Sequence, residues 1–147
     1  MNRAEFKRQV LSLFSESVDG LSLEEKVNYI ENLLIEYQKM NEDERNTSNK
    51  GESWTDEELK IVLSSAPTKY NCMKYARIFK RGYGSIEQIY RWAATTDKMI
   101  QEKRPNDAFV KRIKKGCKRA WFKSVAQLST GFPCGQLLYN KSHSQGE

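Results

Sequence analysis

Three segments spread along the chain carry the Ser/Thr-x-x-Glu/Gln pattern that starts an α-helix. In this capping box, the hydroxyl of the first residue accepts a hydrogen bond from the backbone N–H three residues later, and the Glu or Gln reaches back. The pattern occurs at residues 22–25, 55–58 and 85–88. Apolar residues at helical spacing follow each start, as an amphipathic helix requires. The sequence therefore predicts an all-α fold.

The first 42 residues predict a helical hairpin. A helix over residues 2–17 has Phe6, Val10 and Leu13 on one face, and a second helix begins after Ser22. About 40 residues are too few to form a stable core alone, so the apolar face must pack on the rest of the chain or on a second copy. We expect self-association, with residues 1–42 as a homodimerisation element.

The organisation of the rest of the chain follows from composition. Residues 43–53 are polar and contain Gly, Ser and Asn, so they are interpreted as a linker. Residues 54–128 predict a second helical domain, and residues 129–147, with their Gly and Pro residues, predict a tail.

Within the second domain the sequence predicts three short helices. The first begins at Thr55 and ends near Ser65, because Pro67 disfavours helical geometry in the residue before it. The second covers residues 71–80, and Gly82 and Gly84 then offer positions of positive φ. The third covers residues 85–103. Two helices joined by a tight glycine turn indicate a helix-turn-helix.

The helix predicted for residues 85–103 has two different faces. One is apolar, and the other carries Gln88, Arg91, Thr95 and Lys98. In a DNA major groove, Arg pairs with guanine, Gln with adenine and Thr with the thymine methyl, while Lys holds phosphate. We expect base contacts from Gln88, Arg91 and Thr95, although the same residues also suit a solvated helix face.

These segments resemble a known family. The residues that carry the resemblance are WTDEEL at 54–59, ARIFKR at 76–81, GSI at 84–86 and IYRW at 89–92. They are similar to a Myb/SANT-like helix-turn-helix domain over about residues 54–100. The resemblance implies a three-helix bundle whose third helix enters the major groove. SANT-type domains that bind proteins usually have a more acidic third helix, so the basic outer face here favours DNA.

Charge supports a polyanionic partner. Residues 1–53 carry a net charge of −4 and residues 54–147 one of +10. A further helix after Pro105 has an apolar face containing Val110, Ile113 and Cys117, with many basic residues around it. We expect phosphate contacts from the Lys and Arg residues on and near the two last helices: Lys80, Arg81, Lys98, Lys111, Lys114, Lys115, Lys118 and Arg119.

Several function classes are disfavoured. The three Cys residues are far apart and the one His, His143, lies near the C-terminus, so we expect no metal site and no cofactor. No nucleophile motif or phosphate loop occurs, so we expect neither an enzyme nor a small-molecule substrate. No apolar run is long enough to span a membrane, and the N-terminus lacks a signal-peptide pattern, so we expect an intracellular protein.

The interpretation at this point is a sequence-specific double-stranded DNA-binding protein, a small transcriptional regulator that uses the helix at 85–103. Two alternatives remain open. One is a protein-interaction module, such as an adaptor or an inhibitor of a nucleic-acid enzyme. The other is a non-specific architectural nucleic-acid binder.

Overall fold

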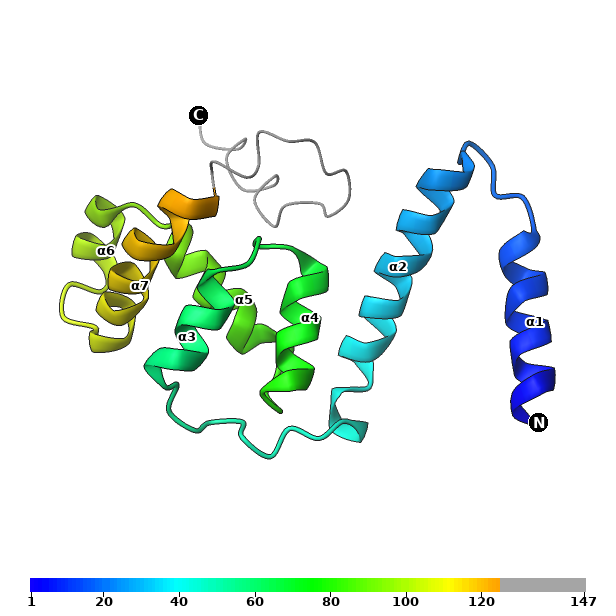
Figure 1. The fold of residues 1–147 in the computed structure, drawn as a ribbon, viewed down its shortest axis with the longest axis horizontal. Helices are drawn as coiled ribbons and strands as arrows, with labels where there is room; N and C mark the ends of the chain where they lie inside the picture. The colour runs from blue at the N-terminus through cyan, green and yellow to red at the C-terminus, as the bar shows by residue number, and fades with distance from the viewer. Residues whose placement is uncertain (125–147) are drawn as a thin grey trace. The chain divides into compact units, whose positions relative to one another are not determined.

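The computed structural model describes residues 1–124 of the chain, and side chains as far as residue 117. This range forms seven α-helices and one short 3₁₀ helix, η1, and contains no β-strand (Figure 1). The all-α prediction is therefore confirmed. No helix in this range is long and apolar enough to cross a bilayer.

The chain divides into two units between Leu34 and Ile35. This boundary falls inside helix α2 (Leu23–Met40) and not in the segment 43–53. The reason is local: Ile35 is a buried member of the core of the second unit, so the C-terminal end of α2 belongs with that unit.

The first unit contains α1 (Arg3–Ser15) and the start of α2. Asn2 caps α1 by accepting from the Glu5 N–H at 2.9 Å. The capping box predicted for α2 is present, because the Ser22 N–H donates to the Glu25 carboxylate at 2.8 Å and the Glu25 N–H donates to the Ser22 hydroxyl at 3.4 Å. Both helices were predicted, but no residue of 1–34 is buried.

The second unit is built on four helices that contact one another. These are α3 (Asp56–Leu63), α4 (Lys69–Ile78), α5 (Tyr83–Ala94) and α7 (Ala108–Ser124), with η1 (Glu42–Glu44) before them and α6 (Asp97–Lys103) between α5 and α7. Figure 1 shows this bundle. Its fully buried side chains come from α3, α4, α5 and α7: Val62, Cys72, Ile86, Ile89, Val110 and Ile113.

Two predicted features of the α4–α5 connection are wrong. Helix α5 begins at Tyr83, so Ser85 lies inside its first turn and is not a cap; its hydroxyl donates to the Gly82 carbonyl at 2.9 Å. Positive φ occurs at Lys80, at 52°, whereas Gly82 has a φ of −69° and Gly84 is helical. The turn therefore does not use the glycines for their conformational freedom.

The helix predicted for residues 85–103 is two helices. Helix α5 ends at Ala94, Thr95 is extended, and α6 begins after Thr96. The Thr96 side chain accepts from the Met99 N–H at 3.3 Å, as an N-cap does. Thr96 followed by Asp97 is itself a helix start, and this local signal interrupts the longer apolar pattern.

Candidate nucleic-acid interface

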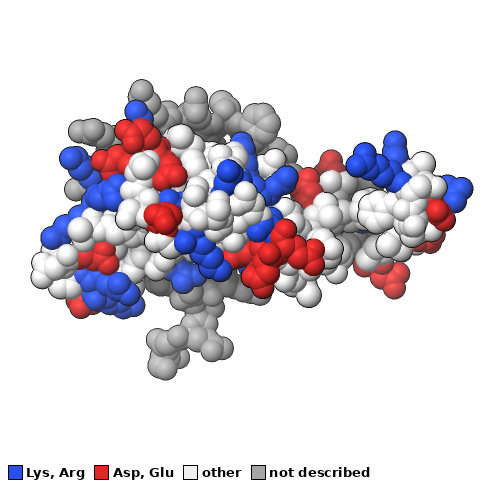
Figure 2. Space-filling model, turned by 90° about the horizontal axis from the view of Figure 1, so that it is seen from below, with Lys and Arg blue, Asp and Glu red and all other residues white. Residues whose placement is uncertain are grey.

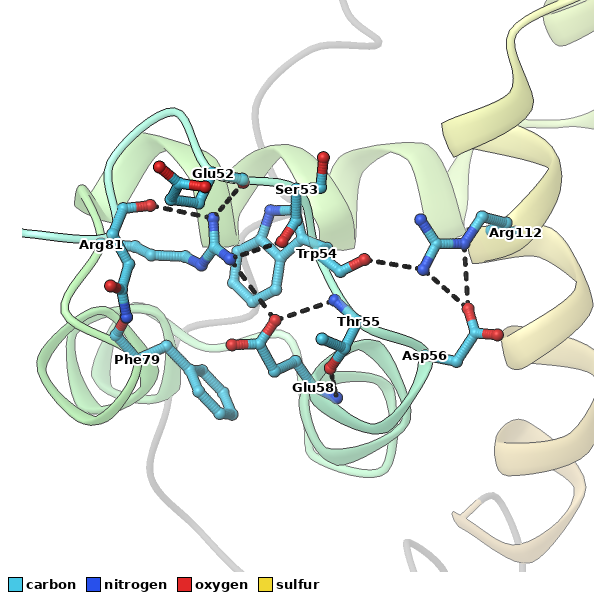
Figure 3. A network of polar contacts seen from close by, with 10 residues as sticks. Glu52, Ser53, Trp54, Thr55, Asp56, Glu58, Phe79, Arg81 and Arg112 are labelled. Carbon is cyan, nitrogen blue, oxygen red and sulfur yellow. Dashed lines mark hydrogen bonds and ion pairs between the residues drawn. The ribbon is translucent and has the colours of Figure 1, made fainter.

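Arg81 is a buried structural residue. It is 4% exposed, and its guanidinium lies 4.0 Å from the centre of the Trp54 ring (Figure 3). Its Nη1 donates to the carbonyl oxygens of Asn49 at 3.1 Å and Glu52 at 2.6 Å, and its Nη2 donates to that of Ser53 at 3.0 Å. The predicted phosphate contact is wrong for Arg81, since its donors are directed at these backbone carbonyls and, from Nη2, at the Glu58 carboxylate 3.4 Å away.

The same contacts order the segment that was predicted to be a linker. Besides the three carbonyls bound by Arg81, the Asn49 side chain donates to the Phe79 carbonyl at 3.0 Å, and the Asn49 N–H donates to that of Lys80 at 3.0 Å. Arg45 donates to the Arg81 carbonyl at 3.3 Å. Residues 43–53 therefore pack along the α4–α5 turn.

Two of the predicted base-contacting residues lie on the outer face of α5. Gln88 and Arg91 are exposed, whereas the opposite face of the helix is buried through Ile86, Ile89 and Tyr90. The Tyr90 hydroxyl donates to the Val62 carbonyl at 3.1 Å, which fixes α5 against α3. A helix held on one side in this way presents Gln88 and Arg91 from a rigid support.

Arg91 and Thr95 both have partners within the chain. Arg91, whose side chain is 71% exposed, donates to the Glu87 carboxylate at 2.7 Å. Such an exposed pair contributes at most about 1 kcal/mol and exchanges easily for another anion. Thr95 lies at the C-terminal end of α5, half-buried, and its hydroxyl donates to the Arg91 carbonyl at 2.7 Å. This bond uses the hydroxyl proton of Thr95, but it leaves the methyl group, which the predicted thymine contact requires, without a role in the bond.

The two ends of α5 are covered by charged side chains of the protein. At the N-terminus, the Glu42 carboxylate accepts from the Tyr83 N–H at 3.0 Å. At the C-terminus, the Lys114 ammonium donates to the Ala93 carbonyl at 3.2 Å and lies 3.7 Å from the Asp97 carboxylate. Each charge has the sign that the helix dipole favours. Lys114 is therefore half-buried and committed to α5, in contrast to its predicted phosphate contact.

Burial acts to raise the pKa of Glu42, but several neighbours act against it. The hydrogen bond from the Tyr83 amide, the hydrogen bond and charge of Lys50, and the charge of Arg45 hold the pKa of Glu42 below its usual value. Glu42 is thus an anion at neutral pH. It occupies the α5 N-terminus, where a phosphate could otherwise bind.

Exposed lysines continue from the C-terminal end of α5 across α6 and α7. Lys98, Lys111 and Lys115 are exposed and have no ion-pair partner among the described residues. Lys111, Lys114 and Lys115 line a shallow groove between α6 and α7. Figure 2 shows Lys and Arg side chains at the end of the unit where these helices lie, with acidic side chains among them.

The remaining predicted phosphate contacts differ in position. Lys80 is exposed at the α4–α5 turn, while the side chains of Lys118 and Arg119 lie outside the described residues. Two further exposed bases at the end of α6, Lys103 and Arg104, were not predicted as phosphate contacts. Their place before Pro105, in the last turn of a helix, was the available signal.

Arg112 also has a role that was not predicted. Its guanidinium donates to the Asp56 carboxylate at 2.7 and 2.9 Å and to the Trp54 carbonyl at 2.7 Å (Figure 3). This contact fastens α7 to the start of α3. Among the described residues, no group of three His, Cys, Asp or Glu side chains could hold a metal ion.

Comparison with known proteins places these helices in a family. The family described as "Uncharacterised protein PM1205 C-terminal domain" matches residues 48–123. The chain belongs to the PM1205 family. A relative, "Uncharacterized protein PM1205" of Pasteurella multocida (strain Pm70), is 45% identical over 114 residues, which cover 77% of this chain and 91% of the relative. No solved structure matches the chain.

The range that matches the family lies within the second unit. It begins in the segment whose carbonyls Arg81 binds and ends at residue 123, so it contains α3 to α6 and all of α7 except its last residue. Helices α1 and α2 lie outside it. Every residue predicted to contact DNA falls inside it.

Proposed function

We propose that the family domain at residues 48–123 binds double-stranded DNA, with the outer face of α5 in the major groove. The observation that carries the proposal is the exposure of Gln88 and Arg91 on a helix whose other face is buried. Their spacing of three residues places them on one face, close enough to reach neighbouring base pairs. Helices α4 and α5 would then act as a helix-turn-helix of Myb/SANT-like type.

The two side chains take different roles in this proposal. Arg91 leaves Glu87 and donates two hydrogen bonds to a guanine, and Gln88 pairs with an adenine. Exchange of Glu87 for guanine costs little because the pair is exposed. Thr95 stays within the proposal as a neighbour of the groove, but recognition depends on Gln88 and Arg91.

Phosphate contacts come from the exposed lysines and not from the α5 N-terminus, which Glu42 covers. Lys98, Lys111 and Lys115 lie on the helices after α5, and Lys80 lies on the turn before it. Residues 97–124 carry ten Lys and Arg residues against three Asp and Glu. Such a surface supports attraction to a polyanion before any base is read.

The test is selection of binding sites from random duplex DNA by the purified full chain, followed by fluorescence anisotropy. We expect enrichment of a defined site, and binding that weakens with salt at a logarithmic slope of about −4 to −5, as about five phosphate contacts would give. Binding to duplex without enrichment would support the architectural alternative. Absence of DNA binding at about 50 mM salt would overturn the proposal.

One structural observation favours the protein-interaction alternative. A groove of about 380 Å³ lies between α4 and the C-terminal end of α2. Its lining combines apolar and basic side chains with one amide: Ile35, Gln38, Tyr70, Met73, Lys74, Arg77 and Ile78. An acidic amphipathic segment would suit this lining, and such binding would persist in variants of Gln88 and Arg91.

A further inference from the structure

The first unit presents apolar side chains that the described residues of one copy leave exposed. On α1, Phe6 is 61% and Leu13 is 70% exposed, and on α2, Leu23 is 74% and Val27 is 46% exposed. These residues lie at helical spacing, so each helix has an apolar stripe. A stripe on an otherwise soluble chain normally marks a contact surface.

The net charges of α1 and α2 indicate which surface would cover the two apolar stripes. Helix α1 carries three basic residues and one acidic residue, a net charge of +2. Residues 23–34 of α2 carry three acidic residues and one basic residue, a net charge of −2. The two helices of one unit therefore have opposite charges and similar apolar stripes, and each helix is a fitting partner for the other.

On both helices, charged side chains lie beside the apolar stripe. On α1, Arg3 and Lys7 are one turn apart and adjoin the apolar face. On α2, Glu24 and Glu31 are two turns apart and flank Val27. All four charged side chains are exposed, so their charges remain available to a partner helix.

We propose that two copies of the chain associate through residues 1–34, with α1 of each copy against α2 of the other. The product is an antiparallel four-helix bundle, in which stripes that are exposed in one copy become a common core. The alternative of α1 closing on α2 of the same copy would cover one side of a two-helix unit and leave it without a core. This association is independent of the proposed DNA binding.

The first experiment measures the mass of the full chain in solution by light scattering. We expect twice the 17.1 kDa of one chain at micromolar concentration. Val27→Asp should give the single-chain mass. The matched control is Ile61→Asp on α3, because both side chains are 46% exposed and only Val27 lies in the first unit. A wild-type mass of one chain up to about 100 μM overturns the proposal, since a functional dimer would form below that range.

The second experiment separates association between copies from closure within a copy. One variant carries Arg3→Glu and Lys7→Glu, so both of its helices are acidic; the other carries Glu24→Lys and Glu31→Lys, so both are basic. Each variant alone should associate at least about tenfold more weakly, because like charges face each other. An equimolar mixture should restore the dimer as a mixed pair, since each helix then meets the opposite charge.

Circular dichroism of each variant shows whether the helices are retained. Failure of the mixture to form a mixed dimer, with helices intact, overturns the arrangement of α1 against the partner's α2. A dimer that Val27→Asp leaves unchanged also overturns it.

Discussion

The guanidinium of Arg81 lies 4.0 Å from the centre of the Trp54 ring and at the same time binds three backbone carbonyls before Trp54. Trp54 directly precedes the Thr55 cap of α3, and Arg81 follows α4. This one contact therefore fixes the entry to α3 against the α4–α5 turn. It also explains why a basic residue near the candidate site is not part of it.

Replacing Arg81 with Met should destabilise the family domain by about 2–4 kcal/mol. Met keeps an apolar stem against Trp54 but leaves the carbonyls of Asn49, Glu52 and Ser53 without their charged donor. Arg81→Lys should recover only part of the loss, because an ammonium cannot reproduce the planar fork. The measurement is the free energy of unfolding from urea titration.

The control is Arg77→Met, which removes the same charge from an exposed position on α4. It should change the unfolding free energy by no more than about 0.5 kcal/mol. Equal effects of the two substitutions would contradict the structural role of Arg81.

Two glycines at the start of α5 should respond differently to alanine. A Cβ on Gly84 meets nothing within 4 Å, so Gly84→Ala should stabilise the helix by about 0.5–1 kcal/mol. A Cβ on Gly82 would lie 2.8 Å from a Glu42 carboxylate oxygen. Gly82→Ala should displace that cap and cost about 1 kcal/mol. Thermal unfolding of both variants checks the contrast, and stabilisation by Gly82→Ala would refute it.

Removal of the Glu42 charge should lower stability in a pH-dependent way. Because the pKa of Glu42 is held below its usual value in the folded chain, its contribution is present above the usual glutamate range and is lost as the pH falls through the lowered pKa. Glu42→Gln should therefore be less stable than wild type by about 1 kcal/mol at pH 7, and this difference should shrink as the pH is lowered toward about 3. Denaturant titrations at both pH values measure this, and a difference that grows on acidification would contradict it.

Cys72 should be unreactive in the folded protein. Burial raises the pKa of the Cys72 thiol to about 12, and the side chain is fully enclosed. With Cys134 replaced by Ser, a thiol reagent at pH 8 should modify Cys72 only after denaturant is added, because both access and thiolate are lacking. Peptide mass mapping of the modified cysteines gives the result. Rapid native labelling of Cys72 would show that the core opens.

Local signals in the sequence were sufficient to predict most of the helices. The Ser22–Glu25 and Thr55–Glu58 boxes start helices as predicted, and the apolar face of α7 was identified through Val110, Ile113 and Cys117. Capping and periodicity involve residues a few positions apart, so they can be recognised without a fold.

Features that depend on distant residues were not predictable. The burial of Arg81 depends on carbonyls of residues 49–53, and the cap of α5 comes from Glu42, 41 residues before Tyr83. Lys114 was chosen for its charge, yet its position against Ala93 only becomes visible in the fold. Composition predicts that a basic surface exists, whereas packing decides which bases remain free on it.

The central claim is that α5 reads duplex DNA through Gln88 and Arg91. The most direct measurement compares Arg91→Ala and Arg77→Ala with wild type by fluorescence anisotropy, on the selected duplex and on a scrambled duplex. Arg91→Ala should lose about 5–150-fold in affinity for the selected site and little for the scrambled one, since a bidentate base contact contributes about 1–3 kcal/mol. Arg77→Ala should affect both duplexes slightly and equally. Equal losses on the two duplexes for Arg91→Ala, or no preference by the wild type, would contradict the account.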